Sequence, residues 1–176
     1  GNASTVALML DKSKNLALGS ELVVNGNFSA GTDGWSVSGG TISASGGVLR
    51  IDQTTIDYAR AYQAITCVIG RTYKFTIQVI SVPAGGSNLV QLGIGTSFSS
   101  SDANVLFQSV ATPQTYTAYF IATATTMYVR PMINIATDNV YAEFDNISVK
   151  EIPGNHAVQA TAASRPLYGI VPFGGR

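Results

Sequence analysis

Short apolar runs separated by turn-forming residues are the feature that most restricts the fold of this chain. They recur roughly every 10–15 residues, and Gly, Asn, Asp, Ser and Pro lie between them. The best helix candidate, 15–22, is short and contains Gly19. We therefore predict strands at 21–24, 47–52, 59–66, 73–82, 88–95, 105–110, 116–122, 127–135 and 140–152.

Several of these runs alternate with a period of two residues. In 73–79 the odd positions hold Tyr, Phe, Ile and Val, whereas the even positions hold Lys74, Thr76 and Gln78. In 89–94 the even positions are apolar and Gln91 lies between two of them. This period is typical of strands with one buried face. Many such strands without helices predict an all-β chain, an antiparallel β-sandwich or jelly roll.

The length of 176 residues fits one domain with additional arms. We place the sandwich module at 21–152, an N-terminal arm at 1–20 and a C-terminal linker or arm at 153–176. The second arm begins with a Pro-Gly turn and continues into an Ala-rich stretch.

Charge is scarce in this sequence. The formal net charge is zero and 11% of residues are charged, against about 25% in typical soluble proteins. The chain lacks the basic patch of nucleic-acid-binding proteins. The long uncharged runs 75–101 and 103–129 are broken by Gly, Pro and polar residues, so we expect no membrane insertion. A charge-poor surface resists self-association poorly, which favours a homo-oligomer.

The residues needed for catalysis are mostly missing. Nucleophilic catalysis needs a base beside the nucleophile, yet His156 lies in the C-terminal arm and Cys67 lies in an apolar run that suggests a buried, inert thiol. One His and one Cys do not make a zinc site. Nothing selects a catalytic pair among the ten acidic residues. We therefore expect a protein that is not an enzyme; a small hydrolase would need an acidic pair in a deep cleft.

Three segments resemble carbohydrate-binding modules of families four and nine. The segment 21–28, followed by Gly34 and Trp35, is similar to their opening strand, Asn-Gly-Asp/Asn-Phe turn and Trp. The segment 142–149 is similar to their last strand, and 70–75 to the entry of a central strand. The resemblance implies a galactose-binding-domain-like jelly roll. We expect Phe28 and Trp35 to cap its core, and Asn25-Gly26 to form a tight turn with positive φ.

The flanks resemble segments of tailed-bacteriophage particle proteins. These are 8–14 before the module, and 154–161 with Arg165-Pro166 after it. This resemblance implies a virion location and other virion proteins as partners.

Many members of the carbohydrate-binding families hold a structural calcium. Asp145 matches their final-strand acid, which makes it the candidate metal ligand. Asn27 and Ser29 replace acids of the family pattern, and these losses weaken a calcium site. We otherwise expect no cofactor.

Aromatic and polar residues on the strands form the candidate ligand surface. Aromatic faces stack on sugars and polar side chains bind their hydroxyls. If the strands share a sheet, one surface combines these residues: Tyr58, Arg60, Tyr62, Lys74, Gln78, Gln91, Tyr128 and Arg130. An inter-subunit contact explains Tyr and Arg there equally well.

The sequence thus predicts a non-catalytic structural module of a phage virion, in a tail fibre or decoration protein. We expect it in a symmetric oligomer such as a trimer, with cell-surface carbohydrate as its ligand. The alternative is a carbohydrate-binding module appended to a secreted glycoside hydrolase.

Overall fold

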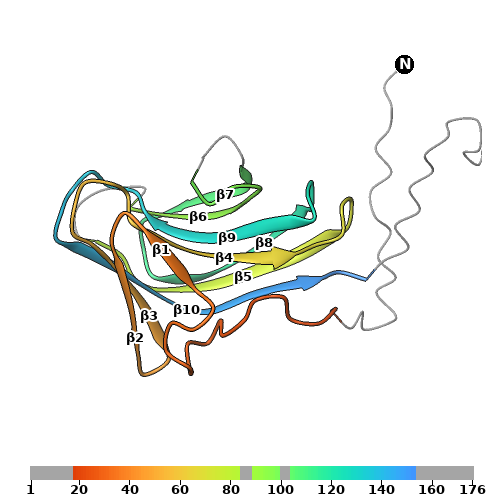
Figure 1. The fold of residues 1–176 in the computed structure, drawn as a ribbon, viewed down its shortest axis with the longest axis horizontal. Helices are drawn as coiled ribbons and strands as arrows, with labels where there is room; N and C mark the ends of the chain where they lie inside the picture. The colour runs from red at the N-terminus through yellow and green to blue at the C-terminus, as the bar shows by residue number, and fades with distance from the viewer. Residues whose placement is uncertain (1–17, 84–88, 100–103, 154–176) are drawn as a thin grey trace, which may run out of the picture.

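Two five-stranded antiparallel sheets face each other in the computed structural model, which describes residues 18–83, 89–99 and 104–153 (Figure 1). We name each sheet by its middle strand. The β9 sheet has the order β1-β4-β9-β6-β7, and the β10 sheet has the order β2-β3-β10-β5-β8. The strands are β1 (Ser36–Ser38), β2 (Thr41–Ser45), β3 (Val48–Gln53), β4 (Arg60–Thr66), β5 (Thr72–Ser81), β6 (Val90–Gly95), β7 (Asn104–Val110), β8 (Gln114–Ile121), β9 (Thr126–Ile133) and β10 (Val140–Glu151).

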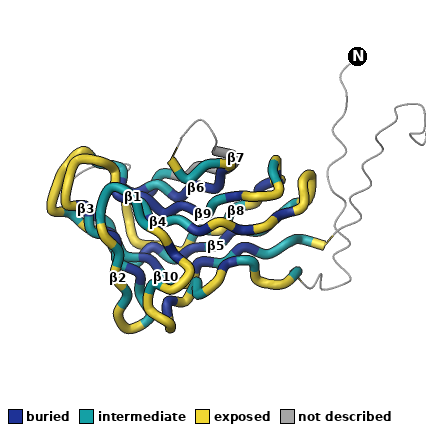
Figure 2. The backbone as a smooth tube through the Cα atoms, in the orientation of Figure 1, coloured by how far each residue is buried: buried dark blue, intermediate teal, exposed yellow. Residues whose placement is uncertain are grey.

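The core lies between the two sheets, and the period-two pattern decides which side chains enter it (Figure 2). In β5 the side chains of Tyr73, Phe75, Ile77 and Val79 are buried, whereas their neighbours are half-buried. In β6 the apolar even positions are buried in the same way. The predicted antiparallel β-sandwich is therefore confirmed.

Eight of the nine predicted runs form strands. The prediction differs from the structure at one run and at two short strands. The run 21–24 contributes only an isolated bridge between Glu21 and Lys150, so a strand there was a wrong prediction. The sequence prediction also missed β1 and β2. Both are short and rich in Ser, and few of their side chains are apolar.

The segment 19–26 lies beside the second half of β10, where β3 no longer pairs with that strand. The Leu22 N–H donates to the Val149 carbonyl at 3.0 Å, and the Ile147 N–H donates to the Gly26 carbonyl at 2.9 Å. A bulge in β10 accompanies this contact. Asn25 has φ of 51°, as the turn prediction required. Gly26 instead serves close packing, because a Cβ there would overlap the Ile147 carbonyl.

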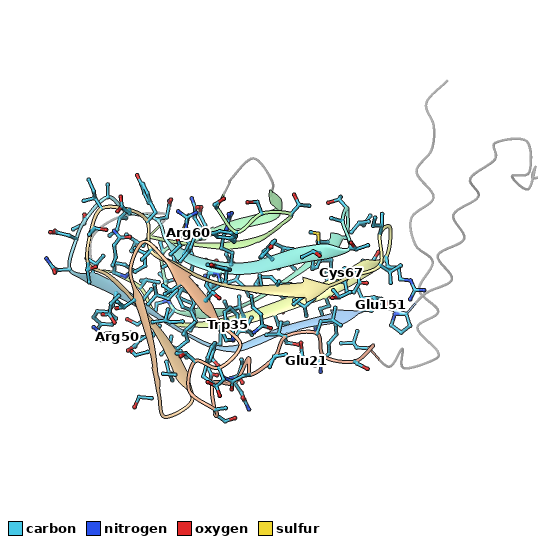
Figure 3. The ribbon with its side chains drawn as sticks, in the orientation of Figure 1. Glu21, Trp35, Arg50, Arg60, Cys67 and Glu151 are labelled. Atoms are coloured by element: carbon cyan, nitrogen blue, oxygen red, sulfur yellow. The ribbon has the colours of Figure 1, made fainter. Side chains whose placement is uncertain are left out.

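Phe28 and Trp35 close one side of the core, as predicted. Phe28 is 2% exposed and Trp35 is 8% exposed, and their ring centroids lie 5.5 Å apart. Figure 3 shows Trp35 among the side chains of the interior. Both rings therefore contribute to stability rather than to a sugar-binding surface.

The predicted arms 1–20 and 153–176 lie outside the described residues, apart from 18–20 and 153. The flanking segments that resemble phage proteins and His156 lie outside them as well. Within the described ranges, no helix has the length and hydropathy needed to span a bilayer.

Candidate functional site

The outer face of the β9 sheet brings together most of the predicted ligand-binding residues. In β4 the alternate residues Ala61, Gln63 and Ile65 are buried, which leaves Arg60 and Tyr62 on the outer side. In β9 the buried residues Val129 and Ile133 leave Tyr128 and Arg130 there. Arg60 pairs with Met132 across the two strands, and the same register sets Tyr62 across from Arg130.

Three aromatic rings form a cluster on this face. Tyr62 and Phe98 are stacked, with ring centroids 4.3 Å apart and an interplanar angle of 15°. Tyr128 approaches both rings, at 6.4 Å from Tyr62 and 5.9 Å from Phe98. Sequence reasoning missed Phe98, which follows β6 and folds back over the sheet. A single aromatic residue among the serines of 97–101 was the only sign of it.

Two guanidinium groups lie beside the aromatic cluster. Arg60 Nη1 donates to the carbonyls of Ser99 at 2.9 Å and Phe98 at 3.5 Å, and its Nε donates to the Tyr58 carbonyl at 3.3 Å. Arg130 Nη1 donates to the same Phe98 carbonyl at 3.3 Å. Figure 3 shows Arg60 on the side of its sheet that faces away from the β10 sheet. The arginines therefore hold the 98–99 backbone against the sheet.

Arg130 is unusual because its guanidinium is buried, with 3% of the residue exposed. Gly93 pairs with Arg130 across β6 and β9 and leaves room for it. A Cβ at Gly93 would lie 3.2 Å from Arg130 Nη2 and 3.3 Å from Nε. Burial lowers the pKa of Arg130 below its ordinary value, and the nearby charge of Arg60 lowers that pKa further.

A hollow of about 250 Å³ opens next to these groups. It combines two guanidinium groups, two amides, a hydroxyl and a tyrosine from three strands and their flanks. Its lining residues are Tyr58, Arg60, Gln91, Ser99, Arg130, Met132 and Asn134. Tyr58, at the entrance to β4, is 41% exposed and has φ of 53°.

A larger hollow of about 490 Å³ lies over the Asn25-Gly26 turn and the β10 bulge. No aromatic residue is among its lining residues. Its Glu21 carboxylate already accepts from the N–H groups of Leu22, Val23 and Val149, at 2.8–3.1 Å. These groups hold the N-terminal segment on β10, so this hollow is the weaker candidate.

The structure separates Lys74 and Gln78 from the other predicted ligand-binding residues. Both lie on β5, in the β10 sheet, whereas Arg60, Tyr62 and Arg130 lie in the β9 sheet. Gln78 Oε1 accepts from Asn146 Nδ2 at 3.0 Å. The single surface expected from the sequence therefore does not include these two residues.

The residues expected around a calcium ion do not form a suitable donor set. Asp145 accepts from the Asn146 N–H at 2.6 Å and from its side-chain amide at 3.0 Å. Asn27 Oδ1 accepts from the Ser29 N–H at 3.3 Å and from its hydroxyl at 3.1 Å. Among the described residues, no three His, Cys, Asp or Glu side chains are grouped to hold a metal ion. Calcium gains affinity from several charged oxygens, and Asp145 supplies one carboxylate.

Cys67 is buried, as the sequence predicted. Burial raises the pKa of its thiol to about 11, although a hydrogen bond with Tyr73 acts in the opposite direction. A thiol with such a raised pKa is a poor nucleophile at neutral pH.

The two-sheet architecture matches solved carbohydrate-binding modules. A family 4 carbohydrate-binding module superposes with a TM-score of 0.56 and 17% identity, over 73% of this chain and 98% of that module. The fold is the jelly roll of carbohydrate-binding modules. A Clostridium thermocellum xylanase structure, which includes a family 22 module and was solved with xylohexaose, gives a TM-score of 0.55 and 16% identity over 78% of this chain.

The jelly roll also matches part of a phage protein. The enzymatically active domain of tailspike protein 4 from bacteriophage CBA120 gives a TM-score of 0.57 and 14% identity over 75% of this chain. The match to this chain covers 21% of that tailspike chain and 29% of the xylanase chain. No family model matches the sequence, and no curated protein matches it either.

Proposed function

We propose that this chain is a non-catalytic carbohydrate-binding module whose saccharide ligand binds on the outer face of the β9 sheet. The observation that supports the proposal best is the cluster of Tyr62, Phe98 and Tyr128 beside the hollow lined by Arg60 and Gln91. Pyranose rings present apolar C–H faces to aromatic rings and hydroxyls to amide and guanidinium groups. The site offers both kinds of contact within one patch.

The absence of catalysis is part of this proposal. The lining of the hollow, among described residues, contains no Asp, Glu, His or Cys. Acid–base catalysis on a glycosidic bond needs a pair of carboxyl groups flanking it. The aromatic and polar contacts of this face are therefore better suited to binding than to bond cleavage.

The proposed biological context is a bacteriophage virion, in which the module belongs to a tail fibre or decoration protein and contacts glycan on the host surface. The flanking sequences and the likeness to a tailspike domain support this context. The likeness to the xylanase structure supports the second candidate, a module appended to a secreted glycoside hydrolase. Light scattering distinguishes them: we expect a homo-oligomer for the virion module and a monomer for the appended one.

Tyr62→Ala tests the location of the site. We expect the affinity for the bound polysaccharide to fall about tenfold or more, which is about 1.4 kcal/mol, measured by calorimetry against a panel of neutral and acidic polysaccharides. Tyr62→Phe keeps the ring and is expected to retain most of the affinity. Tyr119→Ala is the matched control, because Tyr119 is 60% exposed on the β10 sheet.

Three results would contradict the proposal. One is unchanged affinity in Tyr62→Ala, and another is an equal loss in Tyr119→Ala. The third is dissociation of an oligomer by Tyr62→Ala without any saccharide bound by the parent protein. That third result would assign this face to a subunit interface, where Tyr and Arg are also enriched.

A further inference from the structure

The ring of Phe98 covers one face of the Tyr62 ring. Their centroids lie 4.3 Å apart and their planes differ by 15°. Carbon atoms in van der Waals contact are about 3.5–4.0 Å apart, so rings this close leave no layer for a saccharide between them. That face of Tyr62 is therefore unavailable to a ligand. Phe98 is half-buried rather than buried, so part of its own ring stays accessible.

The backbone that carries the Phe98 ring is fixed from two strands and by a local turn. From β4, Arg60 Nη1 donates to the Ser99 carbonyl at 2.9 Å and to the Phe98 carbonyl at 3.5 Å. From β9, Arg130 Nη1 donates to the same Phe98 carbonyl at 3.3 Å. The Ser99 N–H donates to the Ser97 hydroxyl at 3.2 Å. These bonds hold the residue on the outer face of the β9 sheet.

The burial of Arg130 indicates what this side chain contributes to the site. With 3% of the residue exposed, its guanidinium has little contact with the solvent from which a ligand arrives. Its hydrogen bond to the Phe98 carbonyl supports the ring instead. A contact group that is held in place before binding loses less conformational entropy when the ligand arrives, which raises the affinity.

We propose that Phe98 is the ring on which the saccharide stacks, and that Arg60 is its positioning residue. This inference rests on the proposed saccharide-binding function and divides that site into a contact and its supports. Phe98 contacts the ligand, and Tyr62 supports it by stacking. Arg60 acts through the 98–99 backbone that it holds.

The first test changes the ring without uncovering Tyr62. Phe98→Leu keeps an apolar side chain at this position but offers no flat face. We expect its affinity for saccharide to fall about tenfold, measured by calorimetry of the full chain with soluble xylan, dextran and polygalacturonate. Phe98→Tyr keeps the flat ring and is expected to retain most of the affinity. An equal loss in Phe98→Tyr would overturn the stacking role.

A double-mutant cycle tests whether Arg60 acts through Phe98. Arg60→Met removes the N–H donors, and we expect it to weaken binding in the parent chain but to have little further effect together with Phe98→Leu. Arg60→Lys is expected to restore part of the affinity. Arg50→Met is the control, because Arg50 is partly exposed and lies on β3, in the β10 sheet. A full loss in both backgrounds would mean that Arg60 binds the saccharide directly and would overturn its positioning role.

A measurement without ligand tests the same role independently. In nuclear magnetic resonance spectra we expect a nuclear Overhauser contact between the ring protons of Phe98 and Tyr62, in the parent chain and in Arg50→Met. The contact should weaken or disappear in Arg60→Met, and thermal melts verify that each variant is folded. An unchanged ring contact in Arg60→Met would show that the arginine does not position Phe98.

The inference and the proposed function fail in different ways. If Phe98→Leu keeps or raises the affinity while Tyr62→Ala lowers it, Phe98 is not the stacking ring, and saccharide binding on this face stands. If none of the three polysaccharides and no member of the wider panel binds, both proposals are wrong.

Discussion

Gln53, at the end of β3, forms hydrogen bonds with the segment before β4 and with the segment after β9. Replacing it tests how much these hydrogen bonds stabilise the fold. The side chain is fully buried at the end of β3. Its Oε1 accepts from the Ala59 N–H at 2.8 Å, and its Nε2 donates to the carbonyls of Ile135 and Thr137, both at 2.7 Å. The amide oxygen of Gln53 therefore accepts one hydrogen bond, and both N–H groups of its amide nitrogen donate one.

Gln53→Leu keeps the approximate size of the side chain and deletes its amide. The Ala59 N–H lies in a buried position, and an unsatisfied buried donor costs about 1–3 kcal/mol. The Ile135 and Thr137 carbonyls are nearer to solvent, so each lost bond costs about 0.5–1.5 kcal/mol. The expected loss in the free energy of unfolding is therefore about 2–6 kcal/mol, reduced by whatever the added apolar surface contributes.

Urea denaturation followed by fluorescence measures this loss, because Trp35 is the single tryptophan and is buried. Gln114→Leu is the matched control: Gln114 is exposed at the start of β8, and we expect its change to stay within about 0.5 kcal/mol. A loss in Gln53→Leu no larger than that of the control would refute the reasoning. Faster exchange of the Ala59 amide hydrogen in Gln53→Leu would link any loss to the broken bond.

Three further predictions concern the core and the turn that the sequence singled out. Trp35→Ala is expected to lower the free energy of unfolding by roughly 3–5 kcal/mol in chemical denaturation followed by circular dichroism, because it empties a large core volume; a change under 1 kcal/mol would contradict its role in the core. Gly26→Ala is expected to lower the melting temperature strongly, since its Cβ would overlap the Ile147 carbonyl, and an unchanged melting temperature would show that the turn moves at little cost. The Cys67 pKa is raised from 9.0 to about 11, so the folded state holds its proton more tightly than the unfolded state does. The free energy of unfolding should fall as pH rises from about 9 to about 11, and less steeply in Cys67→Ala. Identical slopes would refute this assignment.

Some residues of the candidate site lie on regular strands, and others lie in the connection after β6. Tyr62 and Tyr128 lie on regular strands, where the pleat fixes the direction of each side chain. Phe98 and Ser99 lie in a connection, and contacts with Arg60 and Arg130 hold them. The two arginines and the aromatic cluster therefore depend on each other for their positions.

Local patterns in the sequence determined most of the strands and the faces that they bury. Alternation in 73–79 and 90–94 assigned each side chain to one face, because the pleat has a period of two residues. Phe28 and Trp35 were expected in the core because burying a large apolar side chain is favourable. The placement of Arg60 and Tyr62 on one face also followed from spacing within a single strand, whereas Tyr58 precedes β4 and has φ of 53°.

Only the tertiary structure decided which strands lie side by side. β4 pairs with β9 and β9 with β6, while β5 joins the opposite sheet between β10 and β8. Lys74 and Gln78 are therefore apart from Arg60 and Arg130, although all four lie on outward faces. Alternation orients side chains within a strand but holds no information about its neighbours, because those neighbours are distant in sequence and pairing depends on how the whole core packs.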